Sequence, residues 1–422
     1  MGEKKKMGML RLLSIAVPFV IGSGVSAYAA DFEISGWVST GVGTFSSDDN
    51  PSTVAPTDES EEGGNTFISD AEIHFHIMQE LNNGVDVSFT AEMEINNTAA
   101  GNNNFDELYT TIRGSFGTFQ LGSNDGVMEQ LVPTVAGCTY FTCAADATGI
   151  VFDYRQNSSD DRLDWEVRGA NTGDNVKVTY ITPDVYGLRM GYSYAIDDSE
   201  LSGRDTGSDP QTDGYELAVV YSSDMAGMPL AGTFDVGFGF SNLDGPLINS
   251  TGARVGGSGN ARMGNPAAAN SAGIYSQDGD EKSYYLAANY HVGNFTFGAA
   301  YEERKYNSLS MVDDGNAALV RSDTTKVNGV KEEGYSFGVN YGEGPLSIGV
   351  NYVSQEVPFY REAITANPDV GEAQNYTEKA SGWSVGFDYD LGSGVIIGFE
   401  TGIRKDIGFD AKGSSVMLGV SF

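Results

Sequence analysis

Apolar side chains alternate with polar or small ones along many short stretches of this chain. In residues 346–352 every second position is apolar, from Leu346 to Tyr352, and the same pattern runs from Val416 to the terminal Phe422. A period of two is typical of a β-strand with one apolar face. Turn residues bound most of these runs. The pattern predicts sixteen strands, at 31–45, 65–80, 84–96, 105–115, 117–123, 174–183, 187–196, 213–223, 230–243, 281–292, 294–307, 333–342, 345–357, 380–391, 394–407 and 413–422.

The connections between these strands alternate between short and long. Glu343-Gly344 and Gly392-Ser393 are tight turns, whereas 124–173 and 244–280 are long loops. This order predicts an all-β transmembrane antiparallel barrel of 16 strands, with short periplasmic turns on one rim and long outer loops on the other. A soluble β-sandwich also has alternating strands. The barrel is favoured because nearly every strand has an apolar face, while the opposite face carries charged and small polar residues throughout.

The N-terminal segment has the features of a secretory leader. Basic residues up to Arg11 precede a short apolar run that ends at Ile21, and small residues follow at Ala27 and Ala29. We predict a signal peptide at 1–29 and a single barrel domain at 30–422. A retained membrane anchor is the competing interpretation, but the apolar run is too short to favour it.

Composition and charge exclude several classes of protein. The chain has 24 Lys+Arg against 58 Asp+Glu, a formal net charge of −34, which argues against a protein that grips nucleic acid or an anionic membrane surface through clustered basic residues. Aromatic residues make up 11% and hydrophobic residues 40%, too many for a disordered acidic chain. The 55 glycines suit a β protein with many turns.

The two cysteines lie close together in the longest loop. Cys138 and Cys143 are five residues apart, and in an oxidising compartment they are candidates for a small disulfide-closed loop. A metal-binding pair is the alternative, and the lack of a nearby histidine disfavours it.

The chain resembles the general porins of Gram-negative bacteria over essentially its mature length. The resemblance rests on the leader ending Ala27-Tyr-Ala29, the opening from Phe32 to Val38, the hairpin from Asn175 to Tyr194, and the terminal Phe422. It implies a homotrimer in the outer membrane, in contact with outer-membrane lipid and lipopolysaccharide. It also implies a passage for small hydrophilic solutes and ions, with the third outer loop folded into the pore.

By strand count the constriction loop is 124–173. It departs from the family pattern, because it has no Pro-Glu-Phe-Gly-Gly-like segment and a cysteine pair sits in that place. A diffusion pore needs a water-filled lumen, a narrow zone and a field. The residues expected to line the pore or its constriction are Asp125, Glu129, Asp146 and Asp153 in the loop, and Glu92, Glu94, Arg113, Arg189 and Arg404 on strands. The excess of acidic residues predicts a preference for cations. The preference should be weak, because salt screens the wall charges across a wide pore.

Other functions are less well supported. A hydrolase would need a nucleophile with an oriented histidine, and with three histidines in the chain we do not expect an enzyme. A substrate-specific channel, and a structural or adhesive barrel with little conductance, remain alternatives. His74 and His76 face the same way on one strand, a spacing that serves a metal, but we interpret them as polar lining and predict no metal site. No cofactor is predicted. Acidic loops at Asp278–Glu281 and Asp313–Asp314 leave Ca²⁺ binding open.

Overall fold

A computed structural model gives the arrangement of the strands. The residues that it describes are 31–47, 62–95, 105–141, 171–195, 214–224, 232–244, 274–277, 280–306, 309–312, 326–327, 330–361, 374–406 and 409–422. The leader at 1–29, Asp146, Asp153 and the two acidic loops at which Ca²⁺ binding was left open lie outside the residues whose side chains are described.

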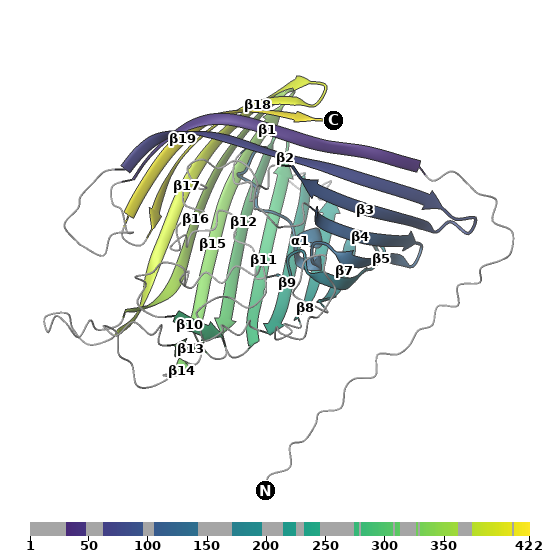
Figure 1. Ribbon diagram of the computed structural model, residues 1–422, viewed down its shortest axis with the longest axis horizontal. Coiled ribbons are helices and arrows are strands. Elements are labelled where there is room, and N and C mark those ends of the chain that lie inside the picture. The colour runs from purple at the N-terminus through teal and green to yellow at the C-terminus, as the bar shows by residue number, and fades with distance from the viewer. Residues whose placement is uncertain are drawn as a thin grey trace, which may run out of the picture.

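Sixteen antiparallel strands close into one barrel, in which β1 pairs with β19 (Figure 1). Each of them overlaps one of the sixteen predicted strands, so the predicted fold class is confirmed. The barrel strands are β1 (Asp31–Ser47), β2 (Glu62–Glu80), β3 (Asp86–Glu94), β4 (Phe105–Gly114), β5 (Gly117–Ser123), β6 (Val176–Ile181), β7 (Leu188–Ala195), β8 (Gly214–Asp224), β9 (Thr233–Asp244), β11 (Asp280–Val292), β12 (Phe295–Tyr306), β15 (Val330–Glu343), β16 (Leu346–Arg361), β17 (Gln374–Gly392), β18 (Val395–Asp406) and β19 (Phe409–Ser421).

Three further strands were not expected from the sequence. β10 (Ile274–Gln277), β13 (Leu309–Val312) and β14 (Lys326–Val327) form a small separate sheet within the long connections. Strands of two to four residues are too short for a period of two to be recognised. A five-residue helix, α1 (Val127–Leu131), also lies within a predicted loop.

The two faces of the barrel differ in character. Outward side chains such as Phe297, Phe337 and Phe399 are large, apolar and 42–53% exposed, whereas inward residues such as Ser283 and Ser384 are fully buried. A continuous apolar outer surface is what lipid hydrocarbon requires of a membrane barrel, since every backbone group already pairs around the ring. No helix in the described ranges has the length and apolar character needed to cross a membrane.

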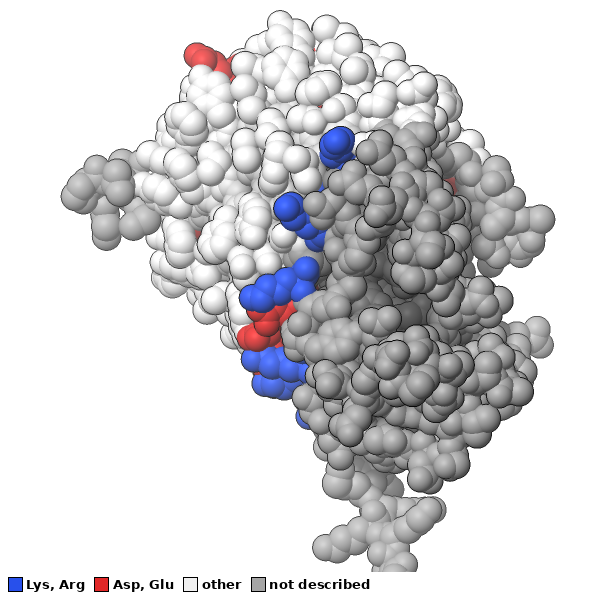
Figure 2. All heavy atoms as spheres, turned by 90° about the vertical axis from the view of Figure 1, so that its left-hand side faces the viewer, with Lys and Arg blue, Asp and Glu red and all other residues white. Residues whose placement is uncertain are grey.

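Charged residues border the apolar outer band at the rim that carries the long loops. On β12, Phe295, Phe297 and Tyr301 face outward, followed by Glu303 and Lys305. Lys305 on β12 pairs with Lys331 on β15, so the charged positions continue from one strand to the next. Figure 2 shows blue and red side chains gathered in a narrow band beside a white surface that carries few charged residues. We call the outward lysines of this rim the lysine belt: Lys282, Lys305, Lys331, Lys379, Lys405 and Lys412.

Candidate functional site

The described start of the longest connection lies against the inner wall of the barrel. Residues 124–141, called here the inner segment, follow β5 and pass from strand to strand. The amide N–H of Val127 donates to Ser193 Oγ on β7 at 3.0 Å, and that of Ala136 donates to Asn289 Oδ1 on β11 at 2.9 Å. Further along, the Gly137 N–H donates to Asn340 Oδ1 on β15 at 2.7 Å. Polar wall residues therefore hold the backbone of this segment at regular intervals.

An apolar seat on the wall receives helix α1 and the residues after it. Val127, Met128, Leu131, Val132 and Val135 are all buried. They pack with inward side chains of β8, β11, β12 and β16, namely Ala218, Val220, Tyr285, Ala287, Ala300 and Val353. Apolar residues inside a barrel with a watery lumen would be unfavourable unless covered, so this cluster fixes the path of the inner segment.

Inward glycines let the segment approach the wall closely. A Cβ added at Gly191 would lie 2.7 Å from the Leu131 side chain, and one at Gly239 would lie 2.9 Å from that of Met128. Both separations are shorter than real Cβ contacts allow. The same holds for other inward glycines along the path, so that together they form a shallow track: Gly191, Gly237, Gly239, Gly298, Gly338, Gly349, Gly398 and Gly419.

A buried carboxylate anchors both ends of the loop. Glu216 on β8 is fully buried, and its Oε2 accepts the Met128 N–H at 3.0 Å while Oε1 accepts that of Thr172. Lys177 is also fully buried; its ammonium donates to the carbonyls of Asn124 and Gly173 and interacts with the Glu216 charge. Two opposite charges that are both removed from water stabilise the loop only as a pair.

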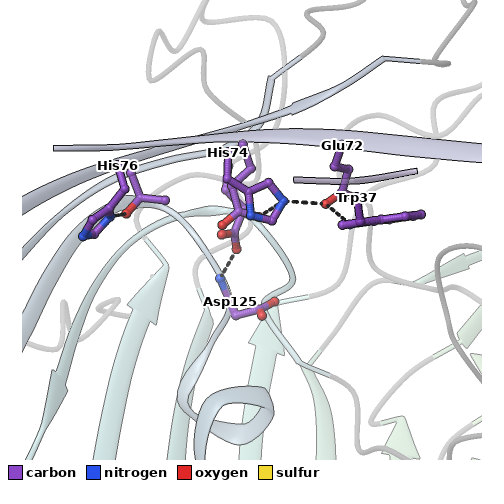
Figure 3. A network of polar contacts seen from close by, with 8 residues as sticks. Trp37, Glu72, His74, His76 and Asp125 are labelled. Atoms are coloured by element: carbon purple, nitrogen blue, oxygen red, sulfur yellow. Dashed lines mark hydrogen bonds and ion pairs between the residues drawn. The ribbon is translucent and has the colours of Figure 1, made fainter. Parts of the chain in front are cut away.

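Carboxylates gather on the wall beside the start of the inner segment. They come from β2, β3, β4, the inner segment and the residues before β6, and we call them the acidic ladder: Glu72, Glu92, Glu94, Asp106, Glu107, Asp125 and Asp174. Oxygens of Glu72, Glu94 and Asp106 lie within 4.8 Å of one another, as do those of Glu107, Asp125 and Asp174. Figure 3 shows Glu72 and His74 on the wall and Asp125 below them, where the Asp125 N–H donates to Glu107 Oε1 at 2.9 Å.

The carboxyl group of Asp125 changes its charge in a pH range that an experiment can cover. It lies in the connection between β5 and α1, where burial, and then the neighbouring carboxylates of Glu129 and Asp174, raise its pKa to about 8. Lys177 opposes this shift in part. Asp125 is therefore mostly protonated and neutral at pH 7, and it gains a negative charge as the pH rises through about 8.

We expect this ionisation to make the interior of the barrel more favourable to cations between pH 7 and pH 9, because a fixed negative charge appears beside the ladder. The zero-current potential under a KCl gradient, recorded at both pH values, measures the change. Asp125→Asn should give a smaller change, since the amide gains no charge as the pH rises. An identical change in the variant would contradict the role of Asp125.

The structure places the predicted site residues in two groups. Glu92, Glu94 and Asp125 belong to the acidic ladder, and Glu129 lies beside it in α1, where its Oε2 accepts from Asn171 at 3.0 Å. The arginines lie elsewhere on inward faces: Arg113 and Arg189 near the turn rim, and Arg404, which is buried, near the loop end of β18. Arg113 is six residues from Glu107, about 20 Å along β4. The predicted acids and arginines therefore do not all meet in one constriction.

Some site residues were missed at the sequence level. Glu107 lies on the inward face of β4 together with Arg113. The alternation of residues along this strand could therefore have identified Glu107 as a residue that lines the interior. Asp106 joins Glu94 only because the register shifts between Ala91 and Met93, and no sequence pattern indicates that bulge. Cys138 is disulfide-bonded; Cys143, the other cysteine, lies outside the described residues.

Comparisons with known proteins agree on one architecture. A family model described as Gram-negative porin matches residues 14–403. The anion-selective porin from Comamonas acidovorans superposes with a TM-score of 0.55 at 14% identity, covering 93% of this chain and 100% of that one. OmpT in trimer form, an outer membrane protein of Vibrio cholerae, gives 0.53 at 12% identity, with 94% and 100% covered. No match was found among curated proteins. At these identities the solved structures establish the fold alone.

Proposed function

The chain belongs to the Gram-negative porins and lies in the outer membrane as a channel protein, and from that premise we propose that it passes small hydrophilic solutes and ions by passive diffusion with a weak preference for cations. The preference is supported by the acidic ladder, in which seven carboxyl groups gather on the inner wall and its adjoining loops, with Asp125 adding its charge as the pH rises through about 8. Among the described residues, two basic side chains lie beside them. His74 contacts Glu72, and the Lys177 ammonium is buried against backbone carbonyls.

The sign of the selectivity depends on local side chains rather than on the fold. The similar barrel from Comamonas acidovorans is described as anion-selective. Fixed charges on a low-dielectric wall attract counter-ions and repel co-ions, so the sign follows the charges that line the narrow zone. Screening over about 8 Å at physiological salt keeps the preference weak in a wide pore.

Single-channel recording tests whether the lumen conducts. The purified, folded protein is expected to insert into planar bilayers and to give discrete, ohmic current steps. A saturating flux with one solute class would favour the substrate-specific channel. Folded protein without steps would favour the structural or adhesive barrel. We propose no catalytic role, and we propose that residues 1–29 are removed on export.

The assembly and lipid partners follow from two different observations. We propose a homotrimer, supported by the likeness to OmpT in its trimer form. We also propose that the lysine belt contacts the phosphates of lipopolysaccharide. It stands at the loop rim, directly beyond the outward apolar band, where lipid headgroups would meet the barrel. One lysine of the belt also forms ion pairs with carboxylates: Lys331 Nζ lies 2.6 Å from Glu303 and 2.8 Å from Glu333.

Replacing Lys405 and Lys412 together by Gln is expected to weaken lipopolysaccharide binding, by about fivefold for each lysine that lies near an anionic surface. Native mass spectrometry or fluorescence titration of the detergent-solubilised protein measures the change. Arg113→Gln, on the inward face near the opposite rim, serves as the control and should have no effect. Equal binding by all three proteins would contradict a role for the belt.

A further inference from the structure

We propose that Glu72, His74 and Glu92 form a binding site for a late first-row divalent cation, with Zn²⁺ as its typical occupant. The three side chains come from the adjacent strands β2 and β3 and face the interior of the barrel, where Figure 3 shows His74 beside Glu72. The proposal goes beyond a general cation preference, because it assigns a defined ligand set with an imidazole nitrogen.

The separations between the ligand atoms suit one metal ion. His74 Nε2 lies 2.9 Å from Glu72 Oε2 and 3.9 Å from Glu92 Oε2. A tetrahedral ion with bonds of about 2.0–2.1 Å holds its ligand atoms about 3.3 Å apart. These two distances lie on either side of that value, and all three ligand atoms lie within 4.8 Å of one another, so side-chain movements can bring them to one centre.

Strand register places the three groups together without a long flexible connection. His74 and Glu92 are direct partners in the β2–β3 pairing, and Glu72 is two residues from His74 on the same face. Trp37 on β1 faces Glu72 in the β1–β2 pairing, and its indole N–H donates to Glu72 Oε2 at 3.1 Å. This hydrogen bond holds the same carboxylate oxygen that contacts His74, and so it orients the carboxylate as hydrogen bonds to ligands do at established metal sites.

The site is partly accessible from inside the barrel. The exposed fractions of the side chains are 28% for His74, 14% for Glu72 and 22% for Glu92. Three protein ligands leave a fourth position for water or for exchange with a passing solute.

The imidazole determines which cation binds best. Ca²⁺ and Mg²⁺ prefer oxygen ligands alone, whereas Zn²⁺ and its neighbours in the first row accept nitrogen readily. Protein ligands release protons when they bind a metal ion, so the affinity of the site for Zn²⁺ is expected to fall as the pH is lowered.

Titration of the full-length, detergent-solubilised protein with Co²⁺ and then Zn²⁺ tests the proposal. Co²⁺ is expected to give the visible absorption of a tetrahedral complex, and Zn²⁺ to abolish it at one equivalent per chain. Mg²⁺ should neither give nor displace that signal. Because the readout is absorption, it reports on the site whether or not the barrel conducts.

Variants on the same strands provide the controls. His74→Ala and Glu92→Gln should each weaken Zn²⁺ binding by at least about tenfold. Loss of an outer-shell partner already costs that much, and these two residues are direct ligands. His76→Ala should bind as the unmodified protein does, since His76 faces the same way but pairs with Thr90 Oγ1 at 3.0 Å. If either substitution prevents folding, the other decides. Absence of a tetrahedral Co²⁺ signal, or equal Zn²⁺ affinity in the folded variants, would overturn the site.

Discussion

Glu216→Ala is expected to release the inner segment from its seat and to produce channels of larger and less steady conductance. Glu216 is fully buried and accepts the N–H groups of Met128 and Thr172 while its charge faces that of Lys177. Removing one member of a buried charge pair costs about 3–5 kcal/mol, because the other charge stays buried without compensation. That cost shifts the equilibrium between seated and unseated segment by a factor of more than about 100.

Single-channel recording with limited proteolysis of the folded barrel measures this release. Glu216→Gln keeps one acceptor oxygen and should have a smaller effect than the alanine variant. Glu343→Gln, at the turn rim, serves as the control for a carboxylate lost elsewhere. Current steps of unchanged size and a loop equally resistant to protease in the alanine variant would contradict the role of Glu216 as an anchor.

The double substitution Glu92→Lys with Glu94→Lys is expected to reverse the ion preference of the channel. Both side chains belong to the acidic ladder, and each substitution exchanges a negative charge for a positive one at the wall. The field in a lumen with low-dielectric walls follows these fixed charges, so anions should then be favoured. The zero-current potential under a KCl gradient should change sign, most clearly at low ionic strength, where screening is weak.

Glu343→Lys is the matched control for this reversal. This substitution makes the same exchange of charge as those in the ladder. Glu343 lies at the turn end of β15 on the outward face, where its carboxylate accepts a hydrogen bond from the Tyr341 hydroxyl. Its variant should keep the sign of the unmodified protein. A double variant that also keeps that sign would show that the ladder does not line the conducting path.

The strands were predictable because lipid and water impose opposite demands on alternate residues. On β16, Ile348 and Val350 must face hydrocarbon while Gly349 and Asn351 face inward, and this requirement appears directly in the sequence. The same argument applies to each barrel strand. It fails for β10 and β14, whose few residues show no period.

The site was less predictable because its parts come from distant segments. Alternation placed Glu92 and Glu94 on the inward face, but it did not show that Glu107, Asp125 and Asp174 would join them. Those contacts depend on the path of the inner segment, which is fixed by residues as distant as Asn289 and Asn340. Alternation likewise placed Arg113 on the inward face of β4, but it did not show that this residue lies near the turn rim, away from the ladder.

The zero-current potential of the unmodified protein in a planar bilayer, recorded under a KCl gradient together with single-channel steps, tests the central claim most directly. The acidic ladder predicts discrete steps and a potential that reports excess passage of K⁺. Steps with a potential that reports excess passage of Cl⁻ would contradict the assignment of the ladder to the conducting path. A folded protein without steps would contradict the channel itself.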